Sequence, residues 1–155
     1  MNQSFESTLD GQREWFEDYL TRDNDIYWVI LNRRGDFVGT TALYNIDFVA
    51  MKAEKGRLIT DEAIAVGGPF VLEAELLLLH FAFKELGLKT IYTTVRDDNV
   101  KMQSVNRKLG FEYKYTIDIR DVPYHYYELS LDVYNPEPFE PILEHWRKRY
   151  ERAKA

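Results

Sequence analysis

"RDDNVKMQSVNRKLGFEY", residues 96–113, is the stretch of this sequence that decides the fold. It reads as the end of a strand, a short helix and the start of another strand. Asn99 is placed to cap the helix, because an asparagine side chain accepts a hydrogen bond from a first-turn amide. Apolar residues recur at 102, 105 and 109 on one helical face, and Gly110 ends the helix. The stretch therefore predicts a strand–helix–strand unit.

The flanking sequence extends this unit in both directions. Upstream, "KTIYTTVR" (89–96) alternates two unlike faces, as a strand does. The mostly apolar segment 69–86 before it predicts a long helix buried against a sheet. Downstream, residues 111–120 and 124–134 predict a hairpin, and a terminal helix follows the prolines over residues 136–155.

The first half of the chain adds one helix and more strands. Residues 7–21 have helical spacing with Ser7 or Thr8 as the cap. Residues 26–31 and 36–46 read as an antiparallel hairpin, and residues 53–60 as the next strand. Together the elements predict an α+β fold with a central mixed, mostly antiparallel sheet flanked by helices.

Composition limits the class of protein. The 155 residues, 45% hydrophobic and without cysteine, suit one domain over residues 1–155 and exclude disulfides, thiolate metal sites and a cysteine nucleophile. We expect a cytoplasmic protein with no signal peptide or membrane span. The net charge of −6 argues against nucleic-acid binding. His80, His125 and His145 are too scattered for a metal site, and His80 is expected in the core.

Residues 96–113, taken with "EAELLLLHFAFKELGLKTIYTTV" (73–95), resemble the conserved segments of the GNAT superfamily of N-acetyltransferases. Asn99 stands eleven residues before Gly110, as in the family pattern. The resemblance covers residues 26–133. It is closest to the branch of ribosomal-protein N-terminal and nucleotide amino-sugar acetyltransferases, because "FVGTTALYNID" and "LLHFAFKELGLKTI" are typical of that branch.

This resemblance implies the fold and the activity. In GNAT proteins acetyl-CoA lies between two splayed parallel strands, here 53–60 and 89–96, and its pyrophosphate rests on a helix N-terminus. The implied reaction is acetyl transfer to a primary amine, either a nucleotide-linked amino sugar or a protein N-terminus. The alternative is a catalytically weak GNAT-fold binding or assembly module. The family's first strand is missing, so the chain is naturally short or truncated, and the uncovered sheet edge favours a homodimer.

The resemblance also implies which residues hold acetyl-CoA. They are Ile59, Thr60, Gly67, Gly68, Phe70, Val71, Leu72, Asn99 and Lys108. The loop departs from the family, because its two glycine positions hold Pro69 and Val71, and Pro69 lacks an N–H. Two interpretations stay open: the amides of residues 70–72 hold the pyrophosphate, or the loop is only a turn that starts a buried helix. Asn99 also reads as a cap alone, and Lys108 as a solvated residue.

Two residues are implied to be catalytic. Glu54 matches a common position of the family base, with Asp61 and Glu62 in reserve, although each also reads as a surface carboxylate. Asn106 occupies the place of the family's tyrosine acid. Its amide cannot act as an acid, but it can donate a hydrogen bond to a thiolate or to the pantetheine. Proton donation would then fall to water or to Tyr113.

The acceptor is expected to meet polar and aromatic side chains from the first helix, the turn after "ALYNID" (42–47) together with that segment, and the last hairpin. These are Trp15, Tyr44, Asn45, Tyr124 and Tyr126. They supply stacking faces and hydrogen-bonding groups that suit a sugar or a peptide end. Each of them taken alone also reads as a packing residue.

Overall fold

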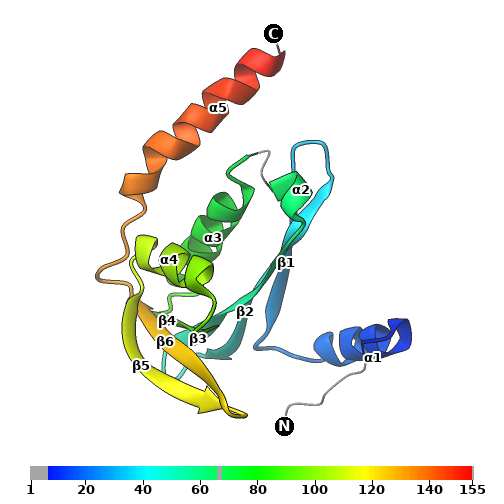
Figure 1. Ribbon diagram of the computed structural model, residues 1–155, viewed down its shortest axis with the longest axis vertical. Helices are drawn as coiled ribbons and strands as arrows, with labels where there is room; N and C mark the ends of the chain where they lie inside the picture. The colour runs from blue at the N-terminus through cyan, green and yellow to red at the C-terminus, as the bar shows by residue number, and fades with distance from the viewer. Residues whose placement is uncertain (1–6, 66–67, 155) are drawn as a thin grey trace.

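The computed structural model describes residues 7–65 and 68–154, in which helices precede, separate and follow groups of strands (Figure 1). The helices are α1 (Leu9–Tyr19), α2 (Glu62–Ala65), α3 (Phe70–His80), α4 (Val100–Lys108) and α5 (Glu140–Lys154). A π-helical turn, η1 (Phe81–Glu85), continues α3, and a 3₁₀ turn, η2 (Glu137–Phe139), precedes α5. The strands are β1 (Ile26–Leu31), β2 (Phe37–Asp47), β3 (Lys52–Thr60), β4 (Thr90–Arg96), β5 (Glu112–Ile119) and β6 (Val122–Ser130). The short helix α2 is the one described helix that the sequence patterns do not predict.

The described strands form one sheet in the order β1-β2-β3-β4-β6-β5. Within it β3 and β4 are parallel, and the other neighbours are antiparallel. This confirms the mixed, mostly antiparallel sheet. β1 lies at one edge, where the amide of Tyr27 donates a hydrogen bond to the hydroxyl of Tyr19 on α1, 3.1 Å away. The homodimer expected from an uncovered edge stays a prediction.

β3 and β4 pair only at their beginnings. Their register runs from Lys52 opposite Thr90 to Glu54 opposite Tyr92. Beyond that point β3 continues along β2, and β4 continues along β6. A bulge in β3 accompanies the separation, with Arg57 at φ 53°. The strands therefore form a fork, as the splayed pair 53–60 and 89–96 predicts.

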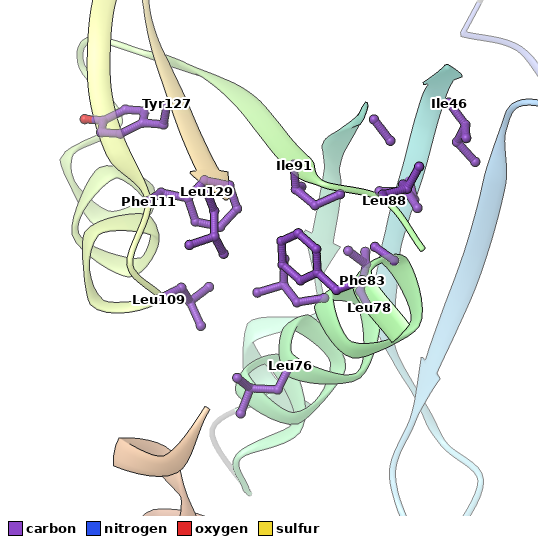
Figure 2. Packing of buried hydrophobic residues seen from close by; sticks show 14 of the residues in the cluster. Ile46, Leu76, Leu78, Phe83, Leu88, Ile91, Leu109, Phe111, Tyr127 and Leu129 are labelled. Atoms are coloured by element: carbon purple, nitrogen blue, oxygen red, sulfur yellow. The ribbon is translucent and has the colours of Figure 1, made fainter. Parts of the chain in front are cut away.

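The hydrophobic core lies on the face of the sheet that α3 and α4 cover (Figures 1 and 2). Leu79, Phe83 and Ile91 are almost fully buried there, so the long apolar segment is the predicted buried helix. His80 corrects the expectation of a core histidine, because it is exposed. Its neighbour three residues back, Leu77, is also 68% exposed, so this side of α3 points away from the sheet.

A charged pair is buried within this apolar layer. Lys55 of β3 and Glu75 of α3 form an ion pair whose side chains are 3% and 1% exposed. Thr41 of β2 donates a hydrogen bond to the second Glu75 oxygen at 3.0 Å. A charge without a partner is costly in such a place, so the pair fixes α3 against one point of β3. No helix in the described ranges is long and apolar enough to cross a membrane.

Removing one partner of this pair tests its role. Lys55→Met should lower the free energy of unfolding by about 3–5 kcal/mol, because it leaves the Glu75 carboxylate buried and unpaired. Urea denaturation measures the loss. The double variant Lys55→Met/Glu75→Leu should recover most of it, since both charges are gone. A single variant as stable as the wild type would contradict the buried pair.

Candidate active site

Glu54 stands at the point where β3 and β4 separate. One of its carboxylate oxygens accepts a hydrogen bond from the Thr94 hydroxyl at 3.1 Å, and the other accepts one from the Asn45 amide at 3.0 Å. Tyr44 lies opposite Glu54 in the β2–β3 register, and burial together with the nearby Glu54 charge raises the pKa of its hydroxyl. Thr94 lies on β4 beyond the last β3–β4 pair, so the carboxylate bridges the two arms of the fork. Glu54 is half-buried and faces away from α3, because Ala53 and Lys55 on either side of it are buried on the inner face.

The Tyr44 ring lies across β3 beside Glu54. A Cβ atom at Gly56 would come within 2.8 Å of the Tyr44 hydroxyl, so the close approach requires glycine. The Arg57 guanidinium packs on the same ring, 3.9 Å from its centroid. Burial raises the pKa of Tyr44 well above its usual value, and the negative charge and hydrogen bond of Glu54 raise it further. The hydroxyl therefore stays protonated beside the carboxylate.

Tyrosines extend this outer face toward β5. Tyr126 stacks on Tyr92 with ring centroids 5.4 Å apart and on Tyr115 at 4.6 Å. The Tyr126 hydroxyl donates to Glu128 at 3.1 Å, and burial followed by the contact with Glu128 raises its pKa. Tyr92 lies opposite Glu54 in the register. We call these three rings the tyrosine platform (Tyr92, Tyr115 and Tyr126). The carboxylates of Glu54 and Glu128 lie beside it.

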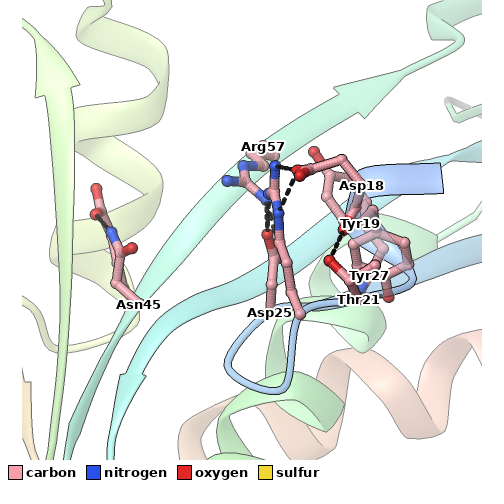
Figure 3. Close-up of polar contacts among 9 residues, drawn as sticks. Asp18, Tyr19, Thr21, Asp25, Tyr27, Asn45 and Arg57 are labelled. Carbon is pink, nitrogen blue, oxygen red and sulfur yellow. Dashed lines mark hydrogen bonds and ion pairs between the residues drawn. The ribbon is translucent and has the colours of Figure 1, made fainter. Parts of the chain in front are cut away.

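A chain of alternating charges joins this face to α1 (Figure 3). Arg57 donates to both Asp25 oxygens at 2.9 Å. Arg22 donates to Asp25 at 2.8 Å and also pairs with Asp18 of α1. Since the Asp25 side chain is only 4% exposed, it is the fixed centre of the chain.

The inner side of the fork contains Asn106, on α4. Asn106 is fully buried, and neither atom of its side-chain amide has a hydrogen-bond partner within the described part of the chain. Buried polar atoms without a partner are rare and call for an explanation, such as a ligand or water that completes them. Asn106 and Glu54 lie on opposite faces of the sheet, so the two predicted catalytic residues would act from opposite sides of the fork.

The predicted pyrophosphate seat is described only in part, because Gly67 lies outside the described residues. Pro69 is the N-cap residue of α3, and Phe70 is its first residue, one position later than predicted. No side chain caps this end, so the amides of residues 70–72 are not engaged by a cap. A Cβ atom at Gly68 would clash with the Tyr150 hydroxyl of α5, so α5 reaches this loop.

The remaining predicted residues have mixed positions. Asn99 caps α4 by accepting a hydrogen bond from the amide of Met102 at 3.1 Å, so the cap is confirmed. Ile59 and Lys108 are exposed, and Thr60 is half-buried at the end of β3. Tyr124 shares the outer face of β6 with Tyr126.

Trp15 and the reserve carboxylates lie apart from Glu54. Trp15 stacks on Tyr19 at 5.4 Å and meets Tyr27 edge-to-face at 5.2 Å, in the cluster between α1 and β1. Asp61 accepts a hydrogen bond from the amide of Ala63 at the start of α2. Glu62 is exposed and lies 3.9 Å from Lys101. None of these contacts is with the Glu54 carboxylate, which leaves Glu54 as the base candidate at the fork.

Sequence reasoning missed several residues of this site. They are Gly56, Arg57, Tyr92, Thr94, Tyr115 and Glu128. The alternation in "TIYTTVR" puts Tyr92 and Thr94 on one face, which is a usable signal for two of them. Arg57 reaches the site through a bulge, which no local pattern predicts. The described residues include no cluster of ligands suited to a metal ion.

A hollow of about 490 Å³ lies elsewhere, between β1 and α3. Its walls are mostly apolar and include Trp28, Leu77 and Phe81. Of the predicted site residues only Phe70 borders it. The hollow is thus on the opposite side of the sheet from the Glu54 carboxylate.

Comparisons with known proteins agree with this fold and show the family. Residues 1–112 match the sequence profile of the acetyltransferase (GNAT) domain. No curated protein sequence matches the chain. Among solved structures, a variant of spermidine N-acetyltransferase SpeG from Vibrio cholerae is 18% identical, with a TM-score of 0.73 over 84% of this chain and 81% of that one. The SpeG structure with manganese ions, also 18% identical, has a TM-score of 0.70 over 84% and 82%. A dodecameric form of the Vibrio cholerae enzyme, again 18% identical, has a TM-score of 0.69 over 81% and 75%.

The raised tyrosine pKa values predict how stability depends on pH. A tyrosine whose pKa is higher in the folded state contributes stability that is complete below the unfolded pKa of about 10 and is lost as pH rises through the folded value. The free energy of unfolding should therefore fall above about pH 10, and Tyr44→Phe should show a smaller fall. Denaturant unfolding at several alkaline pH values measures this. An identical pH dependence in both proteins would contradict the buried Tyr44–Glu54 contact.

Proposed function

Because the chain belongs to the acetyltransferase (GNAT) family, we propose that it transfers the acetyl group of acetyl-CoA to a primary amine, with Glu54 as the base. The observation that carries the proposal is the position of the Glu54 carboxylate across the fork, held by Thr94 and Asn45 beside Tyr44. A carboxylate has about four acceptor sites, so these two donors leave others for the amine or for a water that relays its proton.

The fork offers a fitting place for acetyl-CoA, which supplies the acetyl group as a thioester. Past Glu54 the facing edges of β3 and β4 have no strand partner in each other, so their backbone groups are available to an extended ligand. We propose that Asn106 of α4, whose side-chain amide has no partner among the described residues, meets the cofactor from the inner side of the sheet. We propose that Ile59, Thr60, Asn99 and Lys108 line the cofactor site, and that residues 67, 68 and 70–72 hold the pyrophosphate.

The side chains on the two faces of the sheet would have different roles in the reaction. On the outer face Glu54 takes the proton that the amine must lose before it attacks. On the inner face the Asn106 amide offers an N–H donor, which stabilises negative charge without transferring a proton. The proton that neutralises the leaving sulfur then comes from water.

The side chains of the outer face also indicate which kind of acceptor would bind there. The tyrosine platform offers ring faces for stacking, and Glu54 and Glu128 favour a positively charged amine. We propose a nucleotide-linked amino sugar or a protein N-terminus, which Tyr44, Asn45, Tyr124, Tyr126 and Trp15 would contact or orient. The SpeG structures are named for spermidine acetylation, and a polyamine is a further acceptor that two carboxylates suit.

Exchange of Glu54 tests the proposed base. Wild-type protein should bind acetyl-CoA in calorimetry and release free CoA thiol with at least one amine from a panel of amino sugars, peptides and polyamines. Glu54→Gln should lower kcat by about 10²–10⁴-fold and leave the affinity for acetyl-CoA unchanged. Glu62→Gln, at an 85% exposed side chain, is the matched control and should have no effect. Binding without turnover on any amine would support the binding-module alternative instead.

Exchange of Asn106 separates stability from function. Asn106→Leu removes two buried polar atoms that lack partners, so it should raise the melting temperature of the free protein. The same change should weaken acetyl-CoA binding or lower kcat, because the amide donor is lost. Thermal unfolding and calorimetry measure the two effects. A stabilised variant with full binding and activity would show that Asn106 has no part in the reaction.

A further inference from the structure

We propose that Arg57 is a positioning residue for the transfer reaction, which holds the Tyr44 ring over Gly56 and thereby keeps the Tyr44 hydroxyl on Glu54. The proposal rests on the role of Glu54 as the base. Arg57 does not touch the Glu54 carboxylate in any described contact. It acts through Tyr44, and it is itself held by Asp25.

The bulge in β3 brings Arg57 to the outer face. The register between β2 and β3 shifts after Thr40 pairs with Ile59, and it resumes where Ala42 pairs with Gly56. Arg57 lies in the shifted part with φ 53°, a left-handed backbone conformation that is uncommon for a residue with a side chain. Bulges re-aim side chains next to functional sites. Here the bulge directs the guanidinium onto the rings of Tyr44 and Tyr27, at 3.9 and 5.2 Å.

The Tyr44 ring is confined by β3 itself. Gly56 leaves room for the ring, since a Cβ there would lie 2.8 Å from the hydroxyl and 3.3 Å from a ring carbon. The guanidinium packs on the ring and is attracted to its π face. With the ring held in this way, the Tyr44 hydroxyl stays on the side of β3 where Glu54, its partner in the β2–β3 register, also lies. The base thus keeps a donor that fixes its orientation.

Asp25 fixes the guanidinium in turn. Both Asp25 oxygens lie 2.9 Å from the same Arg57 nitrogen, and the Asp25 side chain is 4% exposed. Arg22 donates to Asp25 and to Asp18, which extends the chain of charges to α1 (Figure 3). A planar guanidinium stacks its face on a ring while its edge binds a carboxylate, a geometry that the compact ammonium group of lysine does not reproduce. The arrangement therefore depends on arginine and not on positive charge alone.

A double-variant cycle tests the proposal. Arg57→Met should lower kcat for the amine by about tenfold while the affinity for acetyl-CoA stays unchanged, because the displaced group is on the outer face. Arg57→Lys should recover only part of the loss. In a Tyr44→Phe background, which lacks the hydroxyl, Arg57→Met should have little further effect on kcat. Arg34→Met, which breaks an exposed pair with Asp36, is the control and should behave as wild type.

Two outcomes would overturn the proposal. In the first, the losses of kcat from Arg57→Met and from Tyr44→Phe multiply in the double variant. This would show that Arg57 does not act through Tyr44. The other is an equal fall in acetyl-CoA affinity, which would indicate a general structural role.

A readout that needs no activity keeps this test separate from the proposed function. Arg57→Met should lower the melting temperature more in the wild-type background than with Tyr44→Ala, because the cation then has no ring to hold. If the wild-type protein transfers no acetyl group, the proposed function fails, and this melting cycle still reports on Arg57. Equal melting shifts in both backgrounds would show that Arg57 does not hold the Tyr44 ring.

Discussion

β3 and β4 are hydrogen-bonded only as far as Glu54 and Tyr92, and beyond that point each strand follows a different neighbour. β6 holds β4 along its whole length, from Thr90 to Arg96, so β4 cannot turn back toward β3. β2 and the bulge hold β3 in the other direction. Backbone groups that face the gap need other partners, and an extended ligand or water can supply them. The site depends on this separation, because it exposes backbone and side chains from both strands at one point.

The alternation of side chains along β3 gives its two faces different tasks. On the inner face Lys55 pairs with Glu75 and attaches α3 to the sheet. On the outer face Glu54, one residue earlier, accepts hydrogen bonds from Asn45 of β2 and from Thr94 of β4. β3, the strand that positions the proposed base, is therefore also the strand to which this buried ion pair attaches α3. This links the stability of the core to the geometry of the site.

Local patterns in the sequence predicted the elements well and the contacts between them less well. The cap at Asn99 and the buried helix after residue 69 follow from spacing and composition, and both are confirmed. Asn45 beside Glu54 was expected on the acceptor side, but its hydrogen bond depends on the register of β2 against β3. The role of Arg57 depends on a bulge, and the burial of Lys55 on a partner twenty residues away. Neither the bulge at Arg57 nor the pairing of Lys55 with Glu75 can be predicted from short-range periodicity.

The most direct test is a crystal structure of the protein with acetyl-CoA. We expect the pantetheine to lie between β3 and β4 beyond Glu54 and Tyr92, with the acetyl group toward Glu54 and the sulfur toward Asn106. The pyrophosphate should meet the amides of residues 70–72. Density for acetyl-CoA in the hollow between β1 and α3, with only water in the fork, would contradict the fork as the cofactor site.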